Sequence, residues 1–501
     1  MITIAGDQCK GCGLCVKNCP LEGIEIIDNK ARTNGNCVSC GICARICPFS
    51  AVSKTQGQDG CVVCTHCPVG CSIPVGKTGA CKRYAHQNGK LVRTRALVME
   101  AAAKTTEKTA LPYQPLVTAV GSGTNYPCCR PAPVIVQDRF NGVDVVTVVT
   151  EAPLSYSGVK VKIDTNVYIG DESSKVRRDG KIVGMVTTEE YGAKMLTIGG
   201  ANLLSHGNNG FIVARTIVDL ANGREVTLKV DGGSTLQIAQ GKPPVINGAA
   251  QTRMRVGCGS ATIGMFAKPL SEVVDEAIIL DYHVIGLLSE HLAGAEVGMR
   301  YSGVVPKGTK STRGRYFGTL GHGWGGTDIC DPQEAVAYVD MAIAKIGSRI
   351  LVTETTGENA ALLMITKDGG VVQTPMTDDV RRAVALIADT CEQSSVSVIY
   401  TGGTGGSARA GVTTMPKKLT EAVHDETVRL TIGGAEAYVL PGGGINFMVD
   451  VSKMVPDAIT WVPTPATVAP VEYTMTRDTY ERLGGHMHCI TDKDAVTRGD
   501  L

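Results

Sequence analysis

The sequence predicts an α+β head followed by a large mixed α/β body, whose middle is β-rich and whose C-terminal half is α/β. Three observations support this prediction. Thirteen of the 19 cysteines lie before residue 82, short β-branched segments alternate with glycine turns up to about residue 250, and helical apolar spacing occurs beside apolar strands beyond it. With 501 residues, the chain is long enough for about three domains of ordinary size.

Composition argues against several classes of function. The chain carries 49 Lys and Arg against 48 Asp and Glu, a net charge of +1, which argues against broad binding to nucleic acid or membrane surfaces. Apolar residues make up 43% of the chain, as in a globular protein. The apolar stretches are shorter than the ~20 residues of a membrane span, and Met1–Gly13 lacks the layout of a signal peptide. We therefore expect a cytoplasmic protein with no nucleic-acid and no membrane partner.

Two cysteine runs near the N-terminus repeat one spacing, C-x2-C-x2-C-x3-C-P. The first run comprises Cys9, Cys12, Cys15 and Cys19, and the second comprises Cys37, Cys40, Cys43 and Cys47. This doubled spacing is typical of chains that hold two [4Fe–4S] clusters, whereas zinc sites usually use pairs of CxxC. The runs resemble those of two-cluster bacterial ferredoxins, so we expect a ferredoxin-like domain over residues 1–57.

The fourth cysteine of each run is expected to cross to the other cluster. The first cluster is then held by Cys9, Cys12, Cys15 and Cys47. The second cluster is held by Cys37, Cys40, Cys43 and Cys19. Between the runs, the apolar Ile24–Ile27 and a turn at Asp28–Lys30 predict a short hairpin over the clusters.

Two ligand sets compete in the next cysteine segment, residues 58–95. The set that we favour comprises Cys64, Cys67, Cys71 and Cys81. Its spacing resembles the cluster loop at the head of molybdopterin oxidoreductases. The alternative set comprises Cys61, Cys64, Cys67 and Cys71, but it lacks a partner run, and a structural zinc site is a third interpretation. Iron analysis separates them, because two clusters bring about eight irons per chain and three bring about twelve.

The head is locally basic. Residues 1–95 carry twelve Lys and Arg against five Asp and Glu. Three clusters, each contributing a charge of about −2, would roughly cancel this excess. We therefore expect the basic residues to stabilise anionic clusters. Docking of an acidic external ferredoxin and an ordinary solvated surface are the alternatives for Lys82, Arg83, Lys90, Arg93 and Arg95.

The remaining chain is expected to contain a linker and two domains. Ala96–Thr118 is Ala-, Thr- and Lys-rich and should be a linker with helical character. In the β-rich domain, 96–250, we expect strands at Val143–Thr150, Val159–Ile163, Lys181–Thr187, Arg224–Val230 and Thr235–Ile238. In an α/β catalytic domain, 251–501, we expect helices at Pro269–Ala293, Pro332–Ile346 and Asp379–Cys391, and strands at Ile350–Val352 and Val396–Tyr400.

Three glycine-rich segments are candidates for binding a ligand. The strongest, Thr401–Arg409, directly follows a predicted strand, and its backbone amides, hydroxyls and arginine suit a phosphate or carboxylate. Its cofactor-binding residues are expected to be Gly402, Gly403, Thr404, Gly405, Gly406 and Ser407. It matches neither a Walker loop nor a dinucleotide fingerprint, and a structural turn is the alternative. The other two segments are Leu320–Asp328 and Leu440–Phe447.

The chain resembles the 6-hydroxynicotinate reductases of anaerobic nicotinate breakdown in its two-cluster head and in four body segments. These segments are GHGWGGT (321–327), ETTG (354–357), GGTGGSARAGV (402–412) and LPGGGINF (440–447). The resemblance implies an iron–sulfur flavoprotein that takes electrons from reduced ferredoxin and forms 1,4,5,6-tetrahydro-6-oxonicotinate. It also implies a covalently held flavin (FAD or FMN) and a homotetramer. The flavin attachment site does not map onto a motif of this sequence.

The implied chemistry suits the parts of the chain. Reducing a pyridone ring costs aromatic stabilisation, so it needs a low-potential donor, and a flavin can gather single electrons from clusters and pass a hydride. The lactam oxygen and the substrate carboxylate call for hydrogen-bond donors and a forked arginine. We expect His322 as the proton donor and Glu354 as an orienting group or acid. Arg409 is expected to clamp the carboxylate, with Arg313 or Arg315 as alternatives.

Two other functions fit the same motifs. One is a ferredoxin-dependent reductase of another unsaturated ring acid, which would still act on a CH–CH group with an iron–sulfur donor. The other is an iron–sulfur electron-transfer subunit of a larger redox complex. A molybdopterin enzyme is disfavoured, because 501 residues including the clusters are few for that fold. A substrate panel and an absorption spectrum would distinguish these functions.

Overall fold

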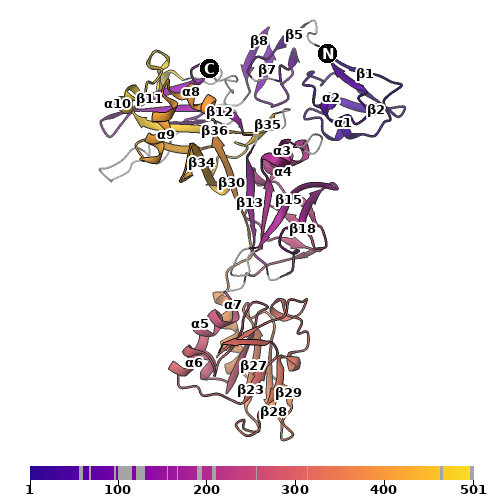
Figure 1. Cartoon of the computed structure of the whole chain (residues 1–501), viewed down its shortest axis with the longest axis vertical. Helices are drawn as coiled ribbons and strands as arrows, with labels where there is room; N and C mark the ends of the chain where they lie inside the picture. Colours follow the sequence, from indigo (N-terminus) through magenta and orange to yellow (C-terminus); the bar gives the residue numbers. More distant parts are fainter. Residues whose placement is uncertain are drawn as a thin grey trace.

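The computed structural model describes residues 1–55, 60–66, 69–94, 97–99, 115–119, 130–154, 156–165, 167–188, 194–205, 210–254, 257–312, 314–462 and 466–496. Figure 1 shows an elongated molecule, with the N-terminal head and two large sheets toward one end and a separate α/β unit at the other. Helices and strands are mixed along the chain, which confirms the mixed fold class. Among the described residues, no helix has the length and apolar character needed to cross a membrane.

The head contains two pairs of short strands and two short helices. The pairs are β1 (Ile2–Ile4) with β4 (Val52–Lys54) and β2 (Ile24–Ile27) with β3 (Lys30–Thr33), both antiparallel. The expected hairpin is confirmed, because Asp28 and Asn29 take the positive φ angles of 51° and 57° that its two-residue turn requires. Helices α1 (Leu14–Lys17) and α2 (Ile42–Ile46) each follow a left-handed glycine. The two cysteine runs therefore share one local structure.

Residues 60–94 form two small hairpins that are anchored to the body. Their strands are β5 (Cys61–Val63), β6 (Ser72–Pro74), β7 (Tyr84–Gln87) and β8 (Lys90–Arg93). Ala466 and Val468, from the body strand β36 (Ala466–Thr476), belong to the apolar core of these hairpins. A buried ion pair also joins Arg83 to Glu151 of the body. The cysteine segment is thus fixed against the body by apolar packing and by charge.

The first body sheet has the strand order β32-β31-β36-β12-β11-β37, with β35 beside β36. Besides β36, its strands are β11 (Val134–Phe140), β12 (Val143–Leu154), β31 (Arg429–Ile432), β32 (Ala435–Glu436), β35 (Thr460–Val462) and β37 (Thr491–Asp492). Three helices lie beside this sheet in Figure 1, namely α8 (Gly406–Val412), α9 (Pro416–His424) and α10 (Arg477–Arg482). Strands β12 and β36 run antiparallel along Val145–Leu154 and form the centre of the sheet.

The second body sheet has eleven strands in the order β20-β19-β18-β17-β14-β15-β16-β13-β30-β34-β33. From 158 to 250 they are β13 (Gly158–Ile163), β14 (Lys175–Arg178), β15 (Lys181–Thr188), β16 (Lys194–Gly199), β17 (Val226–Val230), β18 (Thr235–Ile238), β19 (Val245–Ile246) and β20 (Ala249–Ala250). Later strands are β30 (Val396–Thr404), β33 (Tyr438–Leu440) and β34 (Ile445–Asp450). Helices α3 (Ala201–Ser205) and α4 (Gly210–Ala221) accompany this sheet, and one apolar core joins α4 to both sheets.

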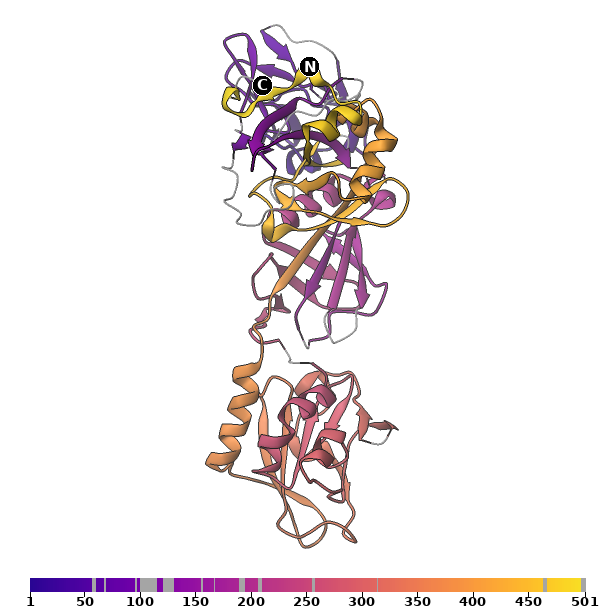
Figure 2. The ribbon, with the colours of Figure 1, turned by 90° about the vertical axis from the view of Figure 1, so that its left-hand side faces the viewer.

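A separate α/β unit, residues 257–391, is inserted between β20 and β30; we call it the inserted unit. Its main sheet has the order β24-β25-β22-β21-β27-β28-β29. The strands are β21 (Glu276–Leu280), β22 (Ile285–Leu287), β23 (Val304–Pro306), β24 (Thr309–Thr312), β25 (Arg315–Phe317), β26 (Val336–Val339), β27 (Arg349–Glu354), β28 (Ala360–Ile365) and β29 (Val371–Thr374). The helices are α5 (Gly259–Ser271), α6 (Leu292–Glu296) and α7 (Asp378–Thr390). Figure 2 shows the unit connected to the remainder of the chain at one end.

This topology changes how the chain divides. Strand β30 pairs with β13, and β34 pairs with β30. The expected boundary at residue 250 therefore does not separate two sheets, because the chain returns to the earlier sheet after the inserted unit. Most of the expected linker lies outside the described residues. Its helical character is wrong at β9 (Leu97–Met99) and at β10 (Val117–Ala119), which pair antiparallel.

Most of the expected secondary structure is confirmed, and two helices are wrong. The five strands expected in the middle region are present, as are the strands at Ile350–Val352 and Val396–Tyr400 and the helix at Asp379–Cys391. The helix expected at Pro269–Ala293 ends near Ser271 and gives way to β21, whose residues are all buried. A run that is apolar on both faces has no alternation to distinguish a strand from a helix. At Pro332–Ile346 the chain forms a single 3₁₀ turn and then β26.

Candidate functional site

Four cysteines of the head line one small cavity. They are Cys19, Cys37, Cys40 and Cys43. Cys19 thus leaves its own run and lies with the second run, in the crossed pattern typical of two-cluster proteins. Burial raises the pKa of Cys40 to about 11 and that of Cys43 to about 12, and neighbouring thiols add to both shifts. Because metals bind thiolates, a cluster in this cavity would displace the protons of these thiols.

Backbone amides of the head donate hydrogen bonds to two sulfurs. Ala31 N–H donates to Cys9 Sγ at 3.3 Å, and Gly23 N–H donates to Cys19 Sγ at 3.1 Å. Hydrogen bonds from the backbone at Ala31 and Gly11 lower the pKa of Cys9, which favours its thiolate form. Hydrogen bonds to sulfur are also among the contacts that tune iron–sulfur clusters.

The cysteines expected to hold the first cluster are partly assembled. Cys9, Cys15 and Cys47 belong to one apolar cluster of the head, while Cys12 is exposed. Burial raises the pKa of Cys15, and the nearby thiols of Cys12 and Cys9 contribute to this shift. Across the described ranges, no three His, Cys, Asp or Glu side chains are grouped so as to hold a metal ion.

The next cysteine segment brings three thiols into one apolar cluster. Cys64 and Cys71 belong to it with Tyr84, and Cys81 packs against it, as does Cys40 of the head. The backbone N–H of Cys64 donates to the carbonyl of Cys71 at 2.8 Å. Cys61 lies on β5 and is not a member of this cluster. Cys67 lies outside the described residues.

A buried arginine lies beside this cysteine cluster. Arg93 faces Tyr84 across the β7–β8 pair, and only 9% of its surface is exposed. Within the described chain, its Nε and Nη1 atoms have no hydrogen-bond partner. Together with burial, the charge of Arg93 lowers the pKa of His66, whose ring stacks on Tyr84 at 4.1 Å. Because these two charged nitrogens are buried without partners, a nearby anion would stabilise this arrangement.

Glu354 is a structural anchor in the inserted unit. Its Oε2 accepts from Gly325 N–H at 2.6 Å, and its Oε1 accepts from Thr356 Oγ1 at 3.0 Å and from the backbone and side-chain nitrogens of Asn359 at 3.1 and 2.9 Å. These bonds tie the glycine-rich loop 320–328 to the end of β27. His322, on the same loop, is exposed. Glu354 therefore positions the loop.

The structure separates the three expected catalytic residues. His322 and Glu354 lie in the inserted unit, whereas Arg409 lies on α8 of the body, at the opposite end of the molecule (Figure 1). Arg409 Nη1 donates to Thr420 Oγ1, and its Nε donates to the Gly405 carbonyl at 3.4 Å. One ring-sized substrate cannot contact both His322 and Arg409. Of the alternative clamps, Arg315 lies on β25 of the inserted unit, and Arg313 lies outside the described residues.

The glycine segment 401–409 is divided between the end of β30 and the start of α8 and is not a loop. Gly402, Gly403 and Thr404 belong to β30 and pair with Phe447, Asn446 and Ile445 of β34. Gly405 is a single turn residue before the short helix α8. This segment lies beside the glycine-rich segment 440–447. Gly406 and Arg409 line an open groove of about 680 Å³ with Gly442, Gly443 and Gly444.

A cavity at the junction of the head and the body was not predicted. It has a volume of about 320 Å³ and is lined by Asn18, Cys19, Pro20, Glu22, Ala80, Cys81, Lys82, Arg215, Val218, Asp219, Asn222, Arg224, Asp457, Ile459, Thr460 and Trp461. We call it the junction cavity. Its walls come from four segments that are far apart in the sequence, so no local motif indicates it.

The chain is similar to a curated protein, the 6-hydroxynicotinate reductase of Eubacterium barkeri. The two sequences are 55% identical over 496 residues, which cover 98% of this chain and 99% of that protein. No protein-family model matches the chain, and no solved structure matches it. The similarity therefore spans the cysteine head, the body sheets and the inserted unit.

Proposed function

This chain belongs to the 6-hydroxynicotinate reductase family, and we propose that it reduces 6-hydroxynicotinate to 1,4,5,6-tetrahydro-6-oxonicotinate. The observation that carries the proposal is the 55% identity across nearly the whole of both chains. The reaction adds two electrons and two protons to the ring, and it makes the protein an oxidoreductase acting on a CH–CH group. Reduced ferredoxin, or a donor of similarly low potential, is the proposed electron source, and a homotetramer in the cytoplasm is the proposed working form.

Two [4Fe–4S] clusters in the head are part of this proposal. The shared cavity of Cys19, Cys37, Cys40 and Cys43 supports the second cluster. Cys9, Cys15 and Cys47 lie in one apolar cluster of the head, together with Cys37 and Cys43, which is compatible with the first site; Cys12 remains its expected fourth ligand. When bound, such clusters transfer electrons one at a time. The amides of Ala31 and Gly23 would stabilise the charge on the sulfurs that they contact.

A third cluster is proposed in the segment 58–95. The apolar cluster of Cys64, Cys71 and Cys81 supports the ligand set that omits Cys61, and Cys67 remains the expected fourth ligand. The Nε and Nη1 atoms of Arg93, which have no hydrogen-bond partner among the described residues, fit a site beside an anionic group. The ion pair of Arg83 with Glu151 holds this segment on the body, and would keep the proposed cluster at the entry to the body.

A flavin, FAD or FMN and covalently held, is proposed from the family resemblance. Of the residues expected to bind it, Gly402, Gly403 and Thr404 are paired within the sheet, whereas Gly405 and Gly406 lie at the start of α8. We therefore derive no step through a flavin at this segment. We also do not carry forward a catalytic site that combines His322, Glu354 and Arg409 of one chain, since Arg409 lies on α8 of the body and the other two lie in the inserted unit.

Turnover by the anaerobically purified, cluster-loaded chain tests the proposed function. Reduced ferredoxin and 6-hydroxynicotinate should give a product two hydrogens heavier than the substrate, identified by mass spectrometry and by loss of pyridone absorbance. The protein should contain about twelve irons per chain if the third cluster is present, and about eight if it is absent. The proposal fails if the loaded protein leaves 6-hydroxynicotinate unchanged, or if it strongly prefers another ring acid.

A further inference from the structure

The junction cavity lies where the two cysteine groups meet the body. Cys19, from the head, and Cys81, from the next cysteine segment, both line it. The opposite wall consists of α4 and the chain just before and along β35, including Trp461. Any molecule in this cavity would therefore border both groups of proposed cluster ligands.

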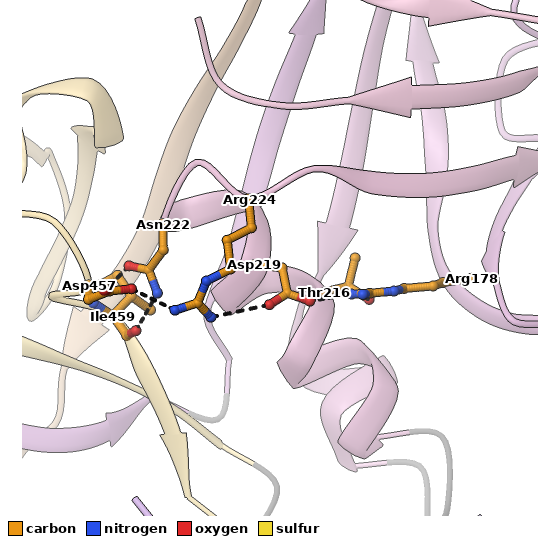
Figure 3. A network of polar contacts seen from close by, with 7 residues as sticks. All are labelled: Arg178, Thr216, Asp219, Asn222, Arg224, Asp457 and Ile459. Atoms are coloured by element: carbon orange, nitrogen blue, oxygen red, sulfur yellow. Dashed lines mark hydrogen bonds and ion pairs between the residues drawn. The ribbon is translucent and has the colours of Figure 1, made fainter. Parts of the chain in front are cut away.

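One wall of the cavity is fixed by a chain of polar contacts, which Figure 3 shows. Arg178 contacts Asp219 at 2.7 Å, and Arg224 bridges Asp219 at 3.5 Å and Asp457 at 2.6 Å. In addition, Asn222 Nδ2 donates to the carbonyl of Ile459 at 2.7 Å. These contacts join the end of α4 to the segment before β35. The wall is therefore held in place without a ligand.

Two cations on the lining of the cavity can pair with an acidic group. The two arginines and two aspartates of the polar chain balance one another. The remaining charges on the lining are Lys82 and Arg215 against Glu22. Over the residues that the structure describes, neither cation has a carboxylate partner, and Arg215 Nη1 instead donates to the carbonyl of Lys17 at 2.8 Å. Arg215 and Lys82 are therefore available to an acidic group of a bound molecule.

The cavity also offers an aromatic surface of suitable size. Trp461 contacts Phe211 edge to face, with ring centroids 6.3 Å apart, so the position of its indole is restricted. Indole faces stack well on planar heteroaromatic rings. A volume of about 320 Å³ is at the small end of ligand pockets, which fits one ring with a carboxylate better than a flavin with its phosphate-bearing chain.

We propose that the junction cavity binds a single-ring heteroaromatic monocarboxylate, with Arg215 and Lys82 at the carboxylate and Trp461 against the ring. The inference rests on the proposed function, in which 6-hydroxynicotinate is such a molecule. It moves the substrate site away from the glycine-rich segments and places it beside Cys19 and Cys81. No residue of the inserted unit lines this cavity.

Binding measurements on the cluster-loaded full chain test the inference. Isothermal titration with 6-hydroxynicotinate, and with the uncharged 6-hydroxynicotinamide, should show that the wild type prefers the acid. Arg215→Gln should weaken binding of the acid about tenfold or more, as expected for loss of a charge-assisted hydrogen bond. It should change binding of the amide little, while Arg215→Lys should restore part of the affinity. Trp461→Leu should weaken binding of both molecules.

Matched controls separate this result from damage to the protein. Arg382→Gln removes an exposed cation of α7, outside the cavity, and should leave binding unchanged. Iron content, flavin content and the visible spectrum of Arg215→Gln should equal those of the wild type. Unchanged acid binding in both Arg215→Gln and Trp461→Leu would overturn the inference. Loss of flavin from either variant, with its acid binding intact, would also overturn it. If the wild type binds the acid through Arg215 but does not reduce it, the proposed function fails and the inference stands.

Discussion

The cysteine head, together with its junction to the body, differs from the inserted unit in whether buried charged side chains have hydrogen-bond partners. Beside the head, Arg93 is buried with partnerless nitrogens, and the junction cavity is lined by charged side chains. In the inserted unit, four hydrogen bonds saturate Glu354. Glu276, fully buried, accepts from the amides of Ala277 and Ser289, both at 3.0 Å.

The contrast shows which signals indicate a ligand. In the sequence, a glycine-rich loop with a histidine suggested a functional site in the inserted unit. In the structure, the buried carboxylates of Glu354 and Glu276 accept hydrogen bonds from groups of the protein itself. Burying charged nitrogens without hydrogen-bond partners is costly, so the two such atoms of Arg93 among the described residues support the proposal of an anionic group beside it. Partnerless buried charge is therefore a better guide to the site here than motif density. The following experiments test this contrast, starting with the largest expected effect.

Removing a cysteine of the head should have the largest effect. Cys19→Ala removes a proposed ligand of the second cluster, and this cysteine also lines the junction cavity. We expect the loss of about four irons per chain and a fall in turnover of at least about 100-fold, measured by iron and sulfide analysis and by anaerobic assay. Cys330→Ala, an exposed thiol of the inserted unit, is the control and should change neither. Full iron content in Cys19→Ala would refute the crossed ligand set.

Replacing the buried arginine should affect one cluster selectively. A cation close to an iron–sulfur cluster stabilises its reduced, more negative state, so Arg93→Met should lower the midpoint potential of one cluster. The potentials of the other clusters should not change in an EPR-monitored redox titration. Lys90→Met, on the same strand but exposed, is the matched control. Identical potentials and equal iron content in wild type and Arg93→Met would mean that Arg93 faces no cluster.

How much the sequence could predict depends on the range of the interactions involved. The cysteine spacing and the turn at Asp28–Asn29 are local, and both were predictable. β21 was missed because a strand buried on both faces carries no alternation. Gly402–Thr404 were taken for a loop, since glycine composition does not reveal pairing with a distant strand. The junction cavity joins segments more than 400 residues apart, which no local pattern encodes.

A buried carboxyl of the body provides a test by pH. Glu472 is fully buried, and burial raises its pKa from 4.5 to about 8 despite hydrogen bonds from Thr118 and Thr431. The folded state therefore binds a proton that the unfolded state releases between pH 4.5 and about 8, so stability falls as the pH rises through this window. Glu472→Gln mimics the protonated form, and the thermal midpoint of this variant should fall less over the same window. Parallel pH profiles would show that folding does not raise the pKa of Glu472.

The smallest effect is expected for His322→Asn. The ring is exposed, and the loop that carries it is held by Glu354 through the amide of Gly325, so the substitution should leave the fold intact. If the substrate binds in the junction cavity, kcat and KM for 6-hydroxynicotinate should stay within about twofold of the wild type. Both should be measured with reduced ferredoxin and with an artificial donor, so that docking and ring chemistry are separated. A tenfold loss of kcat at unchanged iron content would mean that the exposed loop of the inserted unit takes part in the reaction. The junction cavity would then not be the whole site.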